Sequence, residues 1–135
     1  REPRANRDNP HRMKALLDTN ILLLTADNTL PVFQEIQRVV GDIDCITLQS
    51  VVDELHHLCD DGNATACTAH SLVQSKPLKI VSGSSDYADA DIKEYATNND
   101  DIIVITHDRE LIKTLKNHEV TVYRPRQRTH LVKAT

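Results

Sequence analysis

Ile102-Ile103-Val104-Ile105-Thr106-His107-Asp108 is the stretch of sequence that decides the fold. Its four consecutive apolar residues, 102–105, are strong β-formers and predict a short strand that is buried on both faces. Strands of this kind belong to parallel sheets that carry helices on both sides. The apolar run ends in a polar segment, so Asp108 is expected where the chain leaves the sheet.

The rest of the chain repeats this arrangement of a short apolar run followed by a helical pattern. The other predicted strands are at 15–17, 43–47, 78–81 and 120–123. Apolar residues at helical spacing predict helices at 29–40, 50–60, 64–75, 86–98 and 108–117. Alternating strands and helices indicate a parallel sheet, and right-handed crossovers then cover both of its faces. We therefore expect an α/β fold, a three-layer α/β/α sandwich with a parallel, Rossmann-like sheet of about five strands.

Three aspartates and one glutamate occupy related places in this pattern. Asp18 follows the first strand, Asp108 follows the fourth, and Asp89 lies shortly after the third. The carboxyl ends of parallel strands meet at one edge of the sheet, which is where ligands bind in such folds, so these side chains are expected to lie together. Glu54 joins them from the helix after the second strand.

Carboxylates gathered in one cleft repel one another unless a divalent cation binds between them. Oxygen ligands without sulfur or imidazole suit Mg²⁺ or Mn²⁺. Such ions lower the pKa of a bound water and stabilise the attacking and leaving oxygens of a phosphodiester. The candidate catalytic and metal-binding residues are therefore Asp18, Glu54, Asp89 and Asp108.

Each acid also has a purely structural interpretation. Asp108 stands at a position that favours aspartate as a helix N-cap. Asp53 is a direct neighbour of Glu54, and Asp91 follows Asp89 by two residues. The residues alone leave open which of these acids belong to a site.

Four segments resemble the PIN-domain ribonucleases, and they occur in the order in which that family carries them. The segments are Leu16–Asn20, Val51–Leu55, Asp89–Ala96 and Val104–Leu111. In addition, Tyr87-Ala88-Asp89 resembles the archaeal and eukaryotic group that includes the endonuclease of the small-subunit processome. The VapC-like toxins are more distant relatives within the same family.

The resemblance implies a metal-dependent endoribonuclease in which Mg²⁺ or Mn²⁺ is held by the four acids, with Asp89 rather than Asp91 as the third. The residues that it implies in supporting roles are Thr19, Asn20 and Thr106. Asp91 is an additional carboxylate that we also expect in a supporting role, tuning metal occupancy. A homodimer is expected by resemblance only.

Three biological roles remain open at this point. The first is ribosomal RNA processing, with ribosome-assembly proteins as partners, and the Tyr87-Ala88-Asp89 segment favours it. The second is a VapC-type toxin that is controlled by a small antitoxin. The third is an RNA-binding PIN scaffold without catalysis, and the presence of all four acids argues against it.

Both ends of the chain are basic although the net charge of the whole is −4. Residues 1–13 are expected to form a basic arm, 14–124 the nuclease-like domain, and 125–135 a basic tail. Arg124, Arg126 and Arg128 alternate with Pro and an aromatic residue nearby, a mixture that binds single-stranded RNA through phosphate contacts and stacking.

The three cysteines are odd in number and irregularly spaced, which argues against a disulfide framework. His56-x-x-Cys59 and Cys67-x-x-His70 have the short spacing of zinc ligands, but ordinary packed thiols are the prediction here. No apolar run is long enough to span a membrane, and no secretory signal is recognised. A cytoplasmic protein, or a nucleolar one in a eukaryote, is therefore expected.

Overall fold

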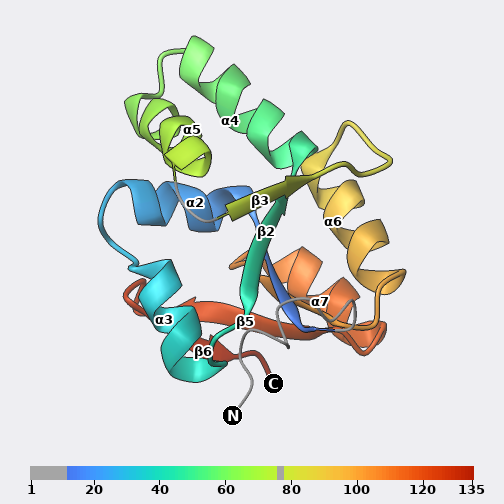
Figure 1. The fold of residues 1–135 in the computed structure, drawn as a ribbon. Coiled ribbons are helices and arrows are strands. Elements are labelled where there is room, and N and C mark those ends of the chain that lie inside the picture. Colours follow the sequence, from blue (N-terminus) through green and yellow to red (C-terminus); the bar gives the residue numbers. More distant parts are fainter. Residues whose placement is uncertain (1–11, 76–77) are drawn as a thin grey trace.

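A computed structural model describes residues 12–75 and 78–135, which form a mixed α/β structure around one sheet (Figure 1). The strands are β1 (Lys14–Leu17), β2 (Asp44–Leu48), β3 (Leu78–Val81), β4 (Ile102–Ile105), β5 (Thr121–Arg126) and β6 (His130–Lys133). Their order across the sheet is β3-β2-β1-β4-β5-β6. The first five are parallel, and β6 pairs with β5 in the antiparallel direction. The predicted α/β architecture is confirmed, with one strand more than expected.

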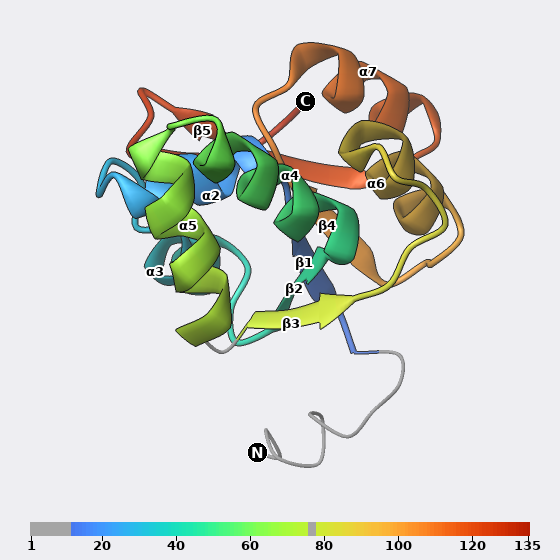
Figure 2. The same ribbon diagram turned by 90° about the horizontal axis from the view of Figure 1, so that it is seen from above.

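Helices cover both faces of this sheet. They are α2 (Thr19–Ala26), α3 (Val32–Val39), α4 (Gln49–Asp60), α5 (Ala64–Ser75), α6 (Ala88–Thr97) and α7 (Arg109–Asn117). In Figure 1, α6 and α7 lie on one side and α2, α3 and α5 on the other. Figure 2 shows α4 between the two groups, and it packs against α2 and α5 on one side and α6 on the other. None of the helices described is long and apolar enough to cross a bilayer.

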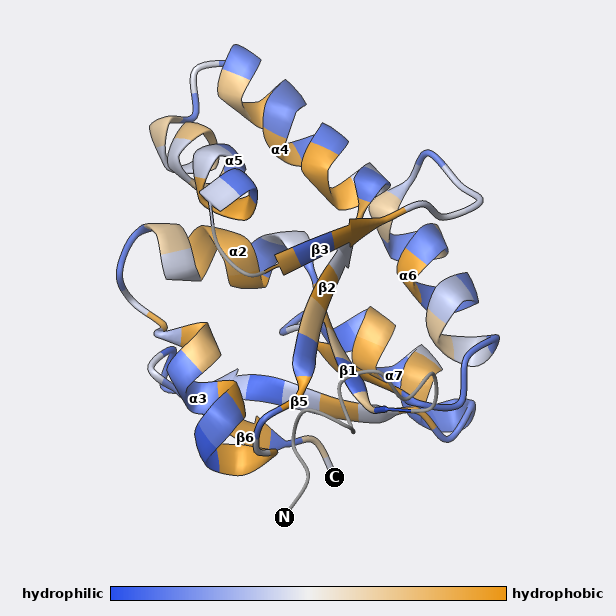
Figure 3. Cartoon of the chain, viewed as in Figure 1, coloured by the Kyte–Doolittle hydropathy of each residue, from blue (hydrophilic) through white to orange (hydrophobic). Residues whose placement is uncertain are grey.

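The core is aliphatic, as the scarcity of aromatic residues requires. The central strands β1 and β4 supply fully or almost fully buried residues, among them Leu16, Val104 and Ile105. The hydropathy colouring in Figure 3 shows the apolar side of the helices turned toward this core. Burial on both faces is the environment that the run at 102–105 predicted, and all four of its residues are buried.

Helix α2 was not predicted, and the reason is local. Its sequence is apolar on most sides, with Ile21, Leu22 and Leu24 all buried, so it shows no amphipathic period. The side chain of Asp18 caps its start by accepting from the Thr19 amide. The consequence is that Asp18 ends a strand and begins a helix at the same point.

Residues 125–135, which we expected to be a tail, instead complete the sheet. β5 continues to Arg126, and β6 returns along it in the register Tyr123↔Lys133. The buried Leu131 side chain packs into the core, and its amide donates to Glu35 Oε1 at 2.9 Å. Arg38 and this amide together lower the pKa of Glu35 to about 2, Arg38 being the larger cause. The expectation of a tail was wrong because it rested on the basic side chains of this segment, which do not indicate its apolar and backbone contacts.

The prediction of free thiols was wrong for two of the three cysteines. Cys59 and Cys67 form a disulfide that links α4 to α5, with their Cα atoms 4.6 Å apart. The short turn between the two antiparallel helices brings them together, and spacing along the sequence cannot show this contact. Cys45 remains free, and burial raises the pKa of its thiol to about 11.

Candidate active site at the carboxyl edge of the sheet

Asp18 lies at the carboxyl end of the central strand β1 and is 2% exposed. Its Oδ1 accepts from the Thr19 amide at 2.7 Å. Its Oδ2 accepts from Asn20 Nδ2 at 3.0 Å and from the Thr106 hydroxyl at 2.6 Å. Burial raises the pKa of Asp18, the bonds from Thr106 and Thr19 lower it, and the nearby charges of Glu54 and Asp108 raise it. The carboxylate is therefore buried, oriented by donors, and close to two further acids.

Glu54 is connected to Asp18 through one intervening side chain. The Thr19 hydroxyl donates to Glu54 Oε1 at 2.5 Å, while the Thr19 amide donates to Asp18. This threonine thus joins the start of α2 to the middle of α4. Asp53, the rival of Glu54 in the sequence, accepts instead from Gln49 Nε2 at 3.0 Å on the exposed side of α4.

Asp108 is a helix cap and a member of the acidic cluster at once. Its Oδ1 accepts from the amides of Glu110 and Leu111 at 3.0 and 3.1 Å, which caps α7. Its own amide donates to the Thr106 hydroxyl at 3.1 Å. Because that hydroxyl also donates to Asp18, Thr106 sets the spacing between the two aspartates. The capping interpretation and the site interpretation are therefore compatible.

Asp89 lies in the first turn of α6, and its side chain reaches solvent. Its pKa is raised to about 6, first by partial burial and then by the charges of Asp18 and Asp108. A side-chain hydrogen bond with Asp108 and the charge of Glu54 add to the shift. The four predicted acids therefore act on one another at the carboxyl edge of the sheet.

Asp91 has a different environment, although it is only two residues from Asp89. It is 1% exposed, and its Oδ2 accepts from the Ser50 hydroxyl at 2.7 Å. Its Oδ1 accepts from the Ser84 amide at 2.9 Å, and a Cβ added to Gly83 would lie 2.0 Å from the same atom. Two residues along a helix separate side chains by about half a turn, so Asp91 points away from the cluster.

Among the described residues, Asp91 accepts from Ser50, Ser84 and Ser85, and its tuning of metal occupancy stays a prediction. The residue instead fastens α6, which carries Asp89, to the loop before it and to the start of α4, the helix that carries Glu54. Ser50, Gly83 and Ser84 were not predicted as parts of this fastening. A glycine between serines and two residues beyond a predicted strand was the available signal.

The predicted supporting residues Thr19, Asn20 and Thr106 all contact the acids. Asn20 donates to Asp18 and also accepts from the His107 amide at 3.3 Å, which ties α2 to the loop after β4. Thr47 was not predicted; its hydroxyl donates to the Leu17 carbonyl at 2.8 Å, next to Asp18. Hydroxyl and amide donors thus hold the strand ends on which the acids stand.

The donor set fits a hard divalent cation in its chemistry. Every candidate ligand is a carboxylate, and oxygen ligands are those that Mg²⁺ and Mn²⁺ prefer. Burial is the largest cause of the raised pKa of Asp89, and the charges of Asp18 and Asp108 add a repulsion that a bound cation would relieve. Within residues 12–75 and 78–135, no three His, Cys, Asp or Glu side chains lie in an arrangement that could hold a metal ion.

The predicted RNA-binding arginines are exposed and follow the same edge of the sheet. Tyr123 of β5 pairs with Ile105 of β4, and the Thr106 amide donates to the Tyr123 carbonyl at 3.2 Å. Arg124 and Arg126 therefore continue beyond the level of Thr106, and strand alternation puts them on one face. Arg128 lies in the turn to β6 with a φ of 65°.

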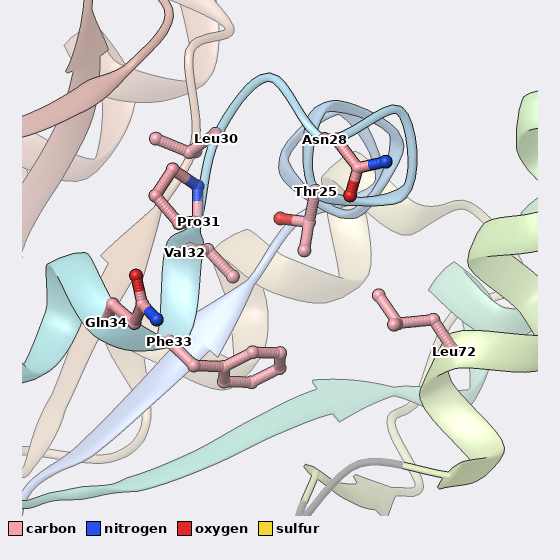
Figure 4. A pocket seen from close by; sticks show the side chains of 8 residues that line it. All are labelled: Thr25, Asn28, Leu30, Pro31, Val32, Phe33, Gln34 and Leu72. Carbon is pink, nitrogen blue, oxygen red and sulfur yellow. The ribbon is translucent and has the colours of Figure 1, made fainter.

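A hollow of about 350 Å³ lies elsewhere, between the start of α3 and α5 (Figure 4). Thr25, Leu30, Phe33 and Leu72 are among its lining residues. None of the four acids lines it, so we assign the site from the acids and not from the size of the hollow.

Known proteins resemble this chain over most of its length. Residues 15–128 match the family model described as a PIN-like domain. The chain is 28% identical to Ribonuclease VapC4 of Methanocaldococcus jannaschii over 122 residues, covering 87% of this chain and 93% of the relative.

Solved structures share the fold at low sequence identity. The PIN domain endonuclease Utp24 superposes with a TM-score of 0.78 at 14% identity, covering 91% of this chain and 92% of that one. A domain of a functionally unknown protein from Methanocaldococcus jannaschii superposes with a TM-score of 0.59 at 17% identity, covering 84% and 91%. These two likenesses support the fold, and the family model covers most of the chain. The chain therefore belongs to the PIN-like domain family.

Proposed function

We propose that this chain is an endoribonuclease that hydrolyses RNA phosphodiester bonds with Mg²⁺ or Mn²⁺. The observation that carries the proposal is the group of four mutually interacting acids at the carboxyl edge of the sheet. The name of the relative Ribonuclease VapC4 supports RNA as the substrate. Asp18, Glu54, Asp89 and Asp108 would hold the cation, which supplies a water of lowered pKa as the nucleophile.

The chain's own contribution is the orientation of the carboxylates. Thr106 and Asn20 donate to Asp18, and Thr19 donates to Glu54, so these two carboxylates are held in place. The amides at the start of α7 do the same for Asp108. Fixed donors of this kind reduce the reorganisation that substrate binding would otherwise require.

We further propose that Arg124, Arg126 and Arg128 bind the phosphates of the RNA. Their exposure and their place beyond the carboxyl edge support this role. Phosphate contacts position a nucleic acid without reading its sequence, so they would provide affinity and not site selection.

The biological role that we propose is ribosomal RNA processing, with ribosome-assembly proteins as partners. The Tyr87-Ala88-Asp89 segment, which resembles the group that includes the small-subunit-processome endonuclease, supports it. The alternative is a VapC-type toxin with an antitoxin partner, which the VapC4 relative supports. Growth arrest on expression, relieved by the product of a neighbouring gene, would favour the toxin. A homodimer and a cytoplasmic or nucleolar site of action complete the proposal.

Cleavage of single-stranded RNA in Mn²⁺ or Mg²⁺ tests the activity. Asp18→Asn and Asp89→Asn should each abolish cleavage, because each removes a charged ligand while keeping the side-chain shape. Asp53→Asn is the matched control, since Asp53 is exposed on α4 and its side chain accepts from Gln49. Cleavage that persists in both site variants, or in excess chelator, would show that the acids are not the active site.

A further inference from the structure

The turn between α4 and α5 carries four side chains that the proposed nuclease site does not use. Cys59 and Cys67 are joined across it. The rings of His56 and His70 face each other beside them, with centroids 5.4 Å apart and planes inclined by 47°. Two sulfurs and two imidazoles therefore lie on one face of the helix pair.

The placement follows from the register of the two helices. His56 precedes Cys59 by three residues on α4, and His70 follows Cys67 by three residues on α5. Residues three apart lie on the same side of a helix, and the helices here run in opposite directions. The contact between the sulfurs therefore implies the contact between the imidazoles, and the structure contains both.

The separation of the two imidazoles matches what a shared metal ion requires. In a tetrahedral zinc site with Zn–N distances of roughly 2.0–2.1 Å, two histidine rings have centroids about 5 Å apart. The observed 5.4 Å needs only a small adjustment of the exposed His56 and the half-buried His70. Asp60 Oδ2 lies 3.3 Å from His56 Nε2, which is the kind of carboxylate partner that orients a metal-binding histidine.

We propose that the α4–α5 turn is a zinc site under thiol control, with Cys59, Cys67, His56 and His70 as ligands. In the disulfide form the sulfurs are bonded to each other, and no three candidate ligands among the described residues are grouped for a metal. Two molecules of a thiol reductant reduce the bond, giving two cysteine thiols and one small-molecule disulfide. One Zn²⁺ then displaces both thiol protons and binds two thiolates and two imidazoles.

The disulfide and the metal are alternative links between the same two helices. Either one holds the end of α4 against α5, because its ligands or sulfurs come from both helices. The site is also separate from the acids in its chemistry: it offers sulfur and nitrogen, whereas the acids offer oxygen only. A spectroscopic probe that reports sulfur ligation can therefore distinguish the two.

Cobalt binding to the whole chain provides that probe. After reduction with a phosphine, which does not bind metal strongly, Co²⁺ alone should produce a thiolate-to-cobalt absorption band and the visible bands of a tetrahedral site. One equivalent of Zn²⁺ should remove both. The disulfide form should show neither, and Co²⁺ held by carboxylates lacks the thiolate band. A reduced chain without that band would overturn the proposal, whatever its nuclease activity.

Variants identify the ligands. Cys59→Ser should weaken the band to half or less, since one of its two thiolates is lost, and His56→Gln or His70→Gln should weaken zinc binding by more than the roughly 10- to 100-fold loss that follows removal of an outer partner. Cys45→Ser and His57→Gln are matched controls that keep the band, since Cys45 lies in β2 and His57 is the neighbouring histidine of α4. Far-ultraviolet circular dichroism verifies that each variant is folded. Unchanged zinc affinity in both folded histidine variants would refute the four-ligand site.

Discussion

Replacing Asp89 with asparagine removes one negative charge from the acidic cluster while keeping the size of the side chain. In wild-type protein without metal, partial burial and the charges of Asp18 and Asp108 raise the pKa of Asp89 to about 6. Folding therefore favours the protonated acid. The variant carries a neutral side chain at every pH, so it should be the more stable protein once wild-type Asp89 is ionised.

The size of this difference in stability follows from the pKa shift of Asp89. A rise from 3.8 to about 6 corresponds to ~3 kcal/mol at roughly 1.4 kcal/mol per pKa unit. Because the Asp89 side chain is exposed, solvent screens much of this energy, and we expect about 1–2 kcal/mol. The stability that an acid with a raised pKa contributes is complete below its unfolded value and is lost as the pH rises through its folded value. The advantage of the variant should therefore be small at pH ~4 and complete above pH ~7.

Urea unfolding in a chelator at these two pH values measures the effect. Asp86→Asn is the control, because Asp86 is an exposed aspartate just before α6 and is not among the causes of the Asp89 pKa shift. Adding Mg²⁺ or Mn²⁺ at the higher pH should stabilise the wild type more than the variant. The wild type should then become the more stable of the two proteins. An advantage of the same size at both pH values would refute the electrostatic coupling of these acids.

Three further predictions concern residues around the site. Thr106→Val keeps the shape of the side chain but removes the hydroxyl between Asp18 and Asp108. The change should lower metal affinity, measured by calorimetric titration, and reduce the free energy of unfolding in urea by roughly 1–2 kcal/mol. Unchanged metal affinity would contradict the bridging role. Gly83→Ala should destabilise the fold by about 1–3 kcal/mol because its Cβ would meet the Asp91 carboxylate, and in an Asp91→Ala background the same change should cost less. A double-mutant cycle in urea checks this, and strictly additive effects would exclude the contact. Replacing Arg124, Arg126 and Arg128 with alanine should reduce the salt dependence of RNA binding by a logarithmic slope of about 2, measured by fluorescence anisotropy over a salt series. An unchanged slope would place these side chains outside the RNA interface.

The sequence by itself determined the elements whose signals are local. The run at 102–105 is long enough in β-formers to predict a buried strand, and α5 was predicted at its observed bounds, 64–75. Parallel strand ends meet at one edge, so the placement of Asp18 and Asp108 near each other followed from their positions after two strands. The patterns of apolar residues that predict strands and helices depend only on neighbours along the chain.

Tertiary structure decided the features that depend on contacts between distant residues. Helix α2 is buried on most sides and lacks an amphipathic period. Residues 130–133 form the strand β6 because they pair with β5 and the Leu131 amide donates to Glu35. Asp89 and Asp91 are alike in sequence, yet one faces the acids and the other bonds to Ser50 on another helix. The Cys59–Cys67 bond likewise exists only because α4 and α5 pack together. In each case a contact between different helices or strands stabilises the feature, and no local pattern of residues encodes that contact.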